Sequence, residues 1–431
     1  MMSPQVIVLA VLYSSTVLAE FHDSGVAGSS APATIADIVQ THAITGITRT
    51  NYFRSSRLLD DETDFYGATI QLKAVPNLTD KIDGKVDARL TNPGINHNEN
   101  TEGQLLEAYF TVHFEQSDIR IGKQVVAWGR ADGINPTDNL TPRDYIVLLP
   151  FEEDQRFGTT ALKLDMYLTQ QYMLSIFMSP FFQPSITPLS MDNAVAKKAV
   201  SRTLSNSQFG MKIDRTGDGL DVSVSYYHGF RLLPDLRITG SDIAGPILEQ
   251  HYDMINAIGA DFARNYGRFG FRGELVYIDT ADSDGVDPGV LNRYMFWVLG
   301  VDRTFLENFN LNVQFFQRLI YHFHSPDDIS DTQERTIAVM NAIADGQRDR
   351  VSNGMSLRIS NKWFNDTLTA ELFTVINFTR HDSYIRPLLT YAFSDNWKGS
   401  AGYELNRGQP DTQFGSLKLN NTGFIELRYA F

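Results

Sequence analysis

Cysteine is absent from the 431-residue chain. Its absence excludes disulfides and thiolate metal sites, and it fits export through an oxidising periplasm. Basic residues are also few, since 37 Lys and Arg stand against 51 Asp and Glu, for a net charge of −14. This balance argues against nucleic-acid binding, which selects basic surfaces. After the N-terminal segment no run reaches the roughly 18 apolar residues of a membrane helix, so a membrane-embedded form would have to cross as strands.

The motifs of common enzyme classes are missing as well. The chain contains no Gly-x-Ser-x-Gly nucleophile motif, no Gly-rich phosphate loop and no His/Glu spacing typical of zinc. His322 and His324 stand where a predicted strand enters a loop, and a surface role is their simpler interpretation. A hydrolytic site would need a nucleophile paired with a base. We therefore predict that the protein is not an enzyme and has no catalytic residues, metal site or cofactor.

The N-terminus has the form of a secretory signal. Val6–Tyr13 is an apolar core, and Val17-Leu-Ala19 provides small or apolar residues before a predicted cleavage after Ala19. The stretch Met1–Gln5 departs from the usual form because it carries no Lys or Arg. We predict a signal peptide at residues 1–19, a periplasmic leader at 20–43 and a membrane barrel at 44–431.

A two-residue period dominates the chain from Ile44 onward. In residues 81–90, five charged side chains alternate with small and aliphatic ones. Successive strand residues face opposite sides, so one face of this strand requires water and the other an apolar neighbour. The next strand repeats the pattern, with Leu106 and Ala108 against Glu107 and Tyr109. Later strands, such as Ile119–Trp128 and Met355–Ser360, can be assigned in the same way.

About eighteen strands are predicted, with sixteen as the other possibility, in an all-β, antiparallel, up-and-down transmembrane barrel. Long and short connections alternate along the chain, as in barrels with long outer loops and short periplasmic turns. Aromatic residues such as Phe114, Trp363 and Trp397 crowd beside the short turns and suggest a girdle at one membrane interface. One outer loop is predicted to hold a helix near Gln333–Ile343.

The last strand carries a family resemblance. Gly423-Phe-Ile-Glu-Leu-Arg-Tyr-Ala-Phe431 resembles the closing strand of Gram-negative outer-membrane β-barrels, whose assembly machinery reads a terminal aromatic preceded by alternating apolar residues. The resemblance implies that Phe431, Tyr429 and Leu427 form this assembly signal. It also implies a place in the outer membrane of a Gram-negative bacterium, among lipid and lipopolysaccharide.

The third long loop, residues 129–156, is the predicted functional segment. A barrel of about 16–18 strands encloses an aqueous channel unless something fills it. This loop holds an apolar run, Ile146–Pro150, suited to burial against the barrel wall. We predict that the loop folds inward and that its charged residues line a constriction: Arg130, Asp132, Asp138, Arg143, Asp144, Glu152, Glu153, Asp154 and Arg156. The alternative is that these acids and arginines pair with each other and with the wall to hold the loop.

Short segments of the chain resemble porins. They are Gly122-Lys-Gln124, Trp128-Gly-Arg-Ala-Asp-Gly-Ile-Asn-Pro136, Ala260-Asp-Phe262 and Arg272-Gly-Glu274, which are similar to a group of uncharacterised porin-like outer-membrane proteins. In porins the third long loop narrows the channel. The resemblance therefore implies a passive channel for small hydrophilic solutes.

Predicted lumen-facing charges are nearly balanced in sign. They include Lys81, Asp83, Lys85, Asp87, Arg89, Arg120, Arg272, Glu274, Glu426 and Arg428. The balance argues against strong anion selectivity, and the acidic excess of the third loop favours a mild cation preference. The alternatives are export of a polysaccharide, transport of hydrophobic compounds, and a non-conducting structural barrel. Homo-oligomerisation is a further possibility, and nucleic acid is not an expected partner.

Overall fold

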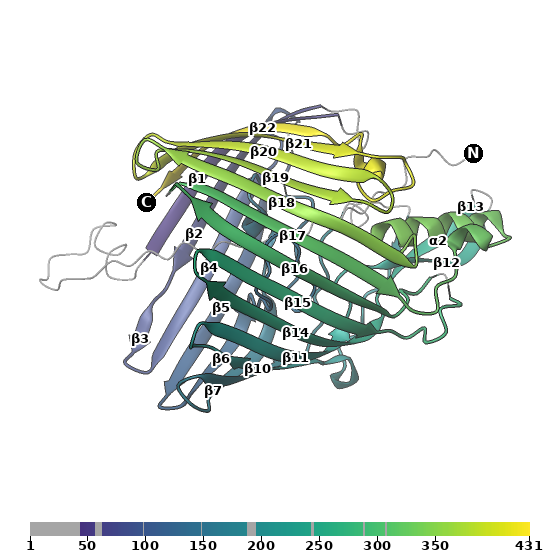
Figure 1. The fold of residues 1–431 in the computed structure, drawn as a ribbon, viewed down its shortest axis with the longest axis horizontal. Coiled ribbons are helices and arrows are strands. Elements are labelled where there is room, and N and C mark those ends of the chain that lie inside the picture. The colour runs from purple at the N-terminus through teal and green to yellow at the C-terminus, as the bar shows by residue number, and fades with distance from the viewer. Residues whose placement is uncertain are drawn as a thin grey trace, which may run out of the picture.

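A closed β-barrel is the whole framework of the protein (Figure 1). The computed structural model describes residues 44–431 except 57–62, 98, 148, 188–194, 243–244, 288 and 307, so the predicted signal peptide and leader lie outside the described residues. Nineteen described strands form one sheet, in which β3 (Asn77–Thr79) only extends the edge of β4. The other eighteen close a ring because β22 pairs with β1.

All neighbouring barrel strands are antiparallel, which confirms the predicted fold class and the prediction of eighteen strands. The strands are β1 (Ile44–Ser55), β2 (Asp64–Ala74), β4 (Ile82–Asn92), β5 (Glu102–Phe114), β6 (Ser117–Gln124), β7 (Thr159–Tyr167), β8 (Tyr172–Ser179), β10 (Gln208–Arg215), β11 (Leu220–Phe230), β14 (Met254–Tyr266), β15 (Phe269–Asp279), β16 (Tyr294–Phe305), β17 (Phe309–Ile320), β18 (Val351–Trp363), β19 (Leu368–Asn377), β20 (Asp382–Ala392), β21 (Trp397–Arg407) and β22 (Thr422–Ala430).

The two faces of the strands differ as the sequence predicts. On β2, Ile70 and Leu72 are each 47% exposed, whereas Thr69, which precedes Ile70 and faces the other side, is 1% exposed. Ile425 and Leu427 of β22 are likewise exposed, and Glu426 is buried. An exposed apolar face around a closed ring is the arrangement that a surrounding lipid phase requires.

Two strand assignments need correction. The strand predicted at Ile119–Trp128 ends at Gln124, because Glu107 captures the N–H of Val125 at 2.9 Å and the chain leaves the sheet. Leu106, predicted to face outward, is 6% exposed because a bulge shifts the register of β5, and Leu105 takes the outward place instead. Alternation alone does not reveal an extra residue of this kind.

The outer loops fold into a cap at one end of the barrel. A small sheet of β9 (Val195–Lys197), β12 (Asp235–Asp242) and β13 (Gly245–His251) packs on the helix α2 (Thr332–Ala344) through Leu236, Leu248 and Ile337. The helix confirms the prediction at Gln333–Ile343, and it lies with β12 and β13 at the end opposite the C-terminus (Figure 1). No described helix is long and apolar enough to span a membrane.

Hydrogen bonds and charges hold the cap together. The side-chain amide of Asn341 in α2 bonds both the N–H and the C=O of Leu236, each at 2.9 Å. Arg231 bonds Asp235 at 2.5 Å and also bonds Asp345, just beyond the helix. Burial raises the pKa of Asp345 well above its usual range, although Arg231 opposes this shift. The cap is therefore a packed unit at this end of the barrel.

Candidate functional site: the third loop and its anchors

The third loop comprises residues 125–158, between β6 and β7. Its first residues alternate like a strand, but their apolar side chains are buried inside the barrel. Val126 and Trp128, each 5% exposed, join a cluster with Leu140 of the same loop and Phe177 of β8. Gly210 of β10 permits this packing, since a Cβ there would lie 2.9 Å from the Trp128 ring. The loop thus begins by packing against the inner wall.

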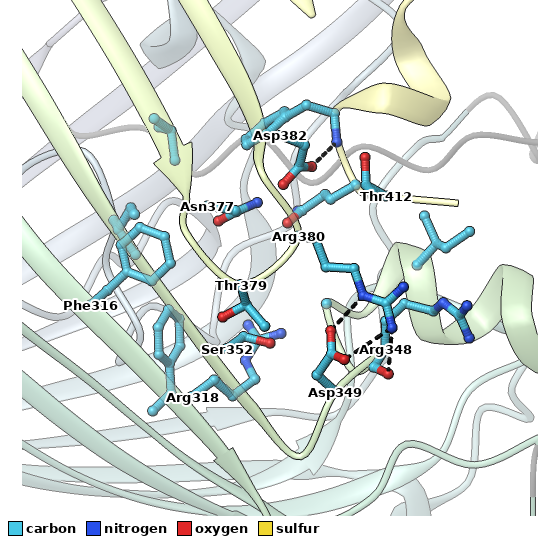
Figure 2. A pocket seen from close by; sticks show the side chains of 17 residues that line it. Phe316, Arg318, Arg348, Asp349, Ser352, Asn377, Thr379, Arg380, Asp382 and Thr412 are labelled. Atoms are coloured by element: carbon cyan, nitrogen blue, oxygen red, sulfur yellow. Dashed lines mark hydrogen bonds and ion pairs between the residues drawn. The ribbon is translucent and has the colours of Figure 1, made fainter. Parts of the chain in front are cut away.

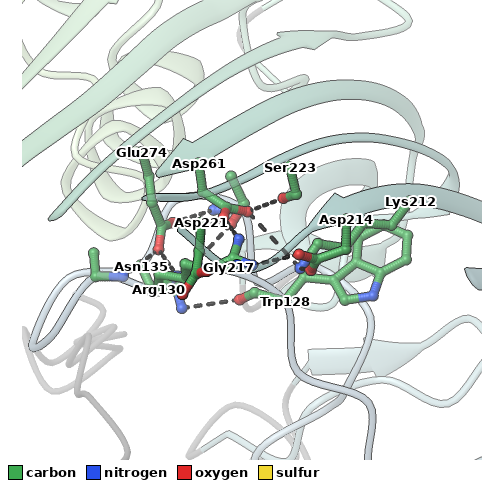
Figure 3. Close-up of polar contacts among 12 residues, drawn as sticks. Trp128, Arg130, Asn135, Lys212, Asp214, Gly217, Asp221, Ser223, Asp261 and Glu274 are labelled. Carbon is green, nitrogen blue, oxygen red and sulfur yellow. Dashed lines mark hydrogen bonds and ion pairs between the residues drawn. The ribbon is translucent and has the colours of Figure 1, made fainter. Parts of the chain in front are cut away.

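One carboxylate of the wall receives the backbone of the loop. Glu274 of β15 accepts hydrogen bonds at Oε1 from the N–H groups of Arg130 (2.7 Å) and Ala131 (2.6 Å). Its Oε2 accepts from the N–H of Thr137 (3.2 Å) and from the Thr137 hydroxyl (2.9 Å). Glu274 is only 3% exposed, so all four bonds are shielded from water. Figure 3 shows this contact beside the Arg130 ion pairs.

Ion pairs reinforce the same anchor. Arg130 donates to Asp214 of β10 at 2.5 Å and to Asp261 of β14, and these two carboxylates raise its pKa although burial opposes the shift. Asp132 pairs with Arg272 of β15 and accepts from Asn312 of β17 at 2.8 Å. The N-terminal half of the third loop is therefore fixed to the wall formed by β10, β14, β15 and β17.

The C-terminal half is fixed to another part of the ring. Asp154 pairs with Arg49 of β1, with one contact at 2.9 Å, and its backbone C=O accepts from Arg89 of β4 at 2.7 Å. Arg386 of β20 donates to the C=O of Pro150. In the pairing order of the strands, β1 lies halfway around the ring from β14. The loop consequently crosses the lumen between opposite walls.

A buried acid ties the two halves together. Asp138 accepts from Arg143 at 3.1 Å and from Arg156 at 2.5 Å. Burial opposes its ionisation, but the two guanidinium groups outweigh this effect and lower the pKa of Asp138. We call the contact of Asp138 with Arg143 and Arg156 the staple. It closes the loop on itself.

The staple predicts how the third loop responds to acid. Because the folded-state pKa of Asp138 is depressed, its stabilising contribution is complete above the unfolded pKa of about 3.9 and is lost as pH falls through the lower folded value. We expect conductance to be unaffected by the staple between pH 7 and about 5 and to become noisier below about pH 4. Recordings of wild type and Asp138→Asn across this range test the prediction, because the variant should already be noisy at pH 7.

The remaining predicted constriction residues have varied surroundings. Asp144 is 8% exposed and accepts from the N–H groups of Ile146 and Val147, each at 3.1 Å; burial raises its pKa against these bonds. Glu153 is exposed, and the side chain of Glu152 lies outside the described set. Leu149 of the apolar run Ile146–Pro150 is buried. The apolar cluster inside the barrel, however, contains none of the described residues of this run, because its loop residues all lie between 126 and 140.

Most of the predicted lumen charges have partners within the barrel. Lys85 pairs with Glu107, Asp87 accepts from Gln71 at 2.8 Å, and Asp83 bonds His113 at 2.7 Å. The Arg120 guanidinium lies 4.5 Å from the centre of the Tyr109 ring. Glu426 of β22 is 2% exposed and lies 3.9 Å from Arg49. Arg428, also in β22, is half-buried, and Lys81 lies exposed in a turn.

Sequence reasoning did not place two wall residues in the site, Arg49 and Asp261, both of which contact the third loop. The alternation of β1 carried a signal for Arg49, since Asn51 and Phe53 share its inner face. Thr48 and Thr50 on the outer face are weakly apolar, and this obscured the pattern.

Comparison with known proteins identifies the architecture. No protein-family description and no curated protein sequence matches the chain. Among solved structures, Pseudomonas aeruginosa OpdK with vanillate (TM-score 0.55, 8% identity) covers 90% of this chain and 98% of its own. Acinetobacter baumannii OccAB3 (0.55, 10% identity) covers 90% and 98%, and P. aeruginosa OccK5 (0.53, 10%) covers 90% and 96%. The chain is therefore similar in fold to outer-membrane porin-type barrels.

Proposed function

We propose that the protein is an outer-membrane channel for the passive diffusion of small hydrophilic solutes, with the third loop as its constriction. The observation that carries the proposal is the attachment of one loop to opposite sides of the ring, through Glu274 and through Asp154. A loop that crosses a lumen narrows it. The ion pairs fix the width of the passage because they hold the loop at both ends.

The charges of the site suit a water-filled passage. The third loop has six acids and three arginines, and several pair with wall residues rather than with solute. The exposed Glu153 and the half-buried Arg272 (35% for the side chain) remain in contact with solvent. This distribution favours small polar solutes and a mild cation preference.

Location and assembly are part of the same proposal. The predicted signal peptide at residues 1–19 would direct export. The terminal residues Phe431, Tyr429 and Leu427 would present the last strand to the barrel-assembly machinery of a Gram-negative outer membrane. The exposed apolar outer face would then contact lipid and lipopolysaccharide.

Planar-bilayer recording of protein purified from outer membranes tests the function. We expect stable open steps and a reversal potential of slightly cation-selective sign in a salt gradient. A folded, heat-modifiable barrel without conductance would contradict the channel and favour a structural role. A strongly anion-selective reversal potential would contradict the charge assignment while leaving the channel intact.

A further inference from the structure

One arginine of the barrel wall faces outward instead of into the lumen. Arg303 lies on the same face of β16 as Leu299, which is 52% exposed on the exterior, because residues an even number apart share a face of a regular strand. The short turn that follows β16 lies at the C-terminal end of the barrel, opposite the cap (Figure 1). Short turns are periplasmic in barrels of this type, so Arg303 stands at the periplasmic leaflet of the membrane.

Two phenylalanine rings hold the Arg303 guanidinium. Its central carbon lies 4.4 Å from the centre of the Phe305 ring and 4.7 Å from the centre of the Phe269 ring in β15. Each of these rings contacts a further one, with ring centres 6.1 Å apart for Phe305 and Phe309 and 6.3 Å apart for Phe269 and Phe271. A cation so close to a ring face is attracted to it, and two rings together fix the position of the guanidinium.

The hydrogen-bonding capacity of Arg303 is unused within the described part of the chain. Its Nε is buried without an acceptor, and no described residue forms an ion pair with it. The adjacent Asp302 lies 3.6 Å from Arg272 in the lumen. By contrast, Arg380 at the cap end bonds Asp349 through two nitrogens, at 2.6 and 2.9 Å (Figure 2). A guanidinium on a lipid-facing surface is costly without an anion beside it, which points to an anion of the membrane.

The surface around Arg303 is positive, although the chain as a whole has a net charge of −14. Arg264 of β14 and Arg268 in the turn to β15 are both exposed at the same end of the barrel. Three acids of β14–β16 make their contacts inside the barrel instead: Asp261, Glu274 and Asp302. At this end the outer face of β14–β16 thus carries three arginines and, among the described residues, no acid. Such a patch complements an anionic membrane surface.

We infer that Arg303 binds the phosphate of an anionic glycerophospholipid in the periplasmic leaflet. Its planar donor fork suits two phosphate oxygens, and the flanking Phe269 and Phe305 rings offer an apolar surface to the acyl chains. An anionic headgroup fits better than a zwitterionic one, because the ammonium group of the latter would meet Arg264 and Arg268. The site is separate from the proposed channel, since it lies on the outer face, and it requires only that the barrel stand in a membrane.

Native mass spectrometry of the detergent-solubilised barrel measures this binding directly. The probes are phosphatidylglycerol and phosphatidylethanolamine with the same acyl chains, titrated into protein purified from outer membranes and stripped of lipid in a nonionic detergent. We expect the wild type to bind the first phosphatidylglycerol several-fold more tightly than phosphatidylethanolamine. Arg303→Gln should weaken phosphatidylglycerol binding about tenfold, in keeping with the loss of hydrogen bonds between charged groups, and should remove the preference.

Two further variants separate charge from geometry and test the site independently of Arg303→Gln. Arg303→Lys keeps the charge but loses the planar fork, so its affinity should fall between those of the wild type and Arg303→Gln. The double variant Phe269→Leu/Phe305→Leu keeps the arginine and an apolar surface but removes the stacking, and it should weaken the preference as well. Arg54→Gln is the matched control. Arg54 belongs to β1 at the cap end, its side chain is 74% exposed, and its loss should leave phospholipid binding unchanged.

Three results would overturn the inference. Equal affinity of the wild type for the two lipids would mean that headgroup charge does not govern the site. An unchanged preference in folded, heat-modifiable Arg303→Gln would place the bound lipid elsewhere. Tighter phosphatidylglycerol binding in Glu307→Gln would mean that this acid, which follows β16 and lies outside the described residues, occupies Arg303 in the wild type. Conductance of Arg303→Gln should equal that of the wild type, so failure of the lipid site and failure of the channel are distinguishable.

Discussion

Glu274→Ala is expected to raise single-channel conductance several-fold. The substitution removes the acceptor of four hydrogen bonds and leaves the N–H groups of Arg130, Ala131 and Thr137 without partners in a buried place. An unsatisfied buried donor costs about 1–3 kcal/mol, so the first anchor of the third loop becomes unfavourable as a whole. The loop should then leave the wall at that end and widen the passage.

The control separates loop release from loss of charge. Glu371→Ala also removes one acid, from the inner face of β19, but it leaves the Glu274 contact intact, and its conductance should stay close to wild type. Glu274→Gln keeps one oxygen for the loop N–H groups and should give an intermediate, noisier current. Wild-type conductance in Glu274→Ala would mean that the third loop does not set the width of the passage.

The barrel was predictable because its signals are local. Each membrane strand presents apolar side chains to lipid on one face and polar side chains to water on the other. This difference appears between neighbouring residues in the sequence, such as Val86 and Asp87. Closure by an even number of strands then follows from the alternation of long and short connections. No long-range pairing had to be known.

The contacts of the third loop were not predictable in the same way. Arg130 meets Asp214 and Asp261, which lie 84 and 131 residues further along the chain. Nothing in the local sequence of either acid marks it as a partner. The spacing predicted that charges would fill the lumen, but only the fold determines which charges neutralise one another and which remain in water.

The apolar part of the lumen was missed for a different reason. In β16, Val298 is 0% exposed and its neighbour Leu299 is 52% exposed, so both faces of the strand are apolar. Leu299 faces the exterior, while Val298 belongs to the cluster that receives Trp128 and Ile134 of the third loop. When the inner face of a strand is also apolar, apolar and polar residues no longer alternate along the sequence. The two-residue period then cannot show which face points into the barrel and which faces lipid.

Gly46→Val is expected to destabilise the closed barrel at its seam. Gly46 of β1 exchanges both backbone hydrogen bonds with Phe431, at 2.7 and 2.9 Å, and the Phe431 ring covers it from outside. A Cβ at this position would lie 2.2 Å from the ring, so the last aromatic residue must turn away from the strand. Overpacking of this kind costs about 1–3 kcal/mol, and here it also uncovers the hydrogen bonds that close the ring.

Urea unfolding of barrels refolded into detergent micelles measures the effect without the assembly machinery. The midpoint should fall for Gly46→Val, and the second substitution Phe431→Ala should restore part of it by removing the clash. Gly84→Ala is the matched control on β4, where an added Cβ meets only ordinary contacts at 3.4 Å and beyond. An unchanged midpoint in Gly46→Val would show that the ring can leave without loss. The role of Phe431 in the folded barrel would then be separable from its proposed role in assembly.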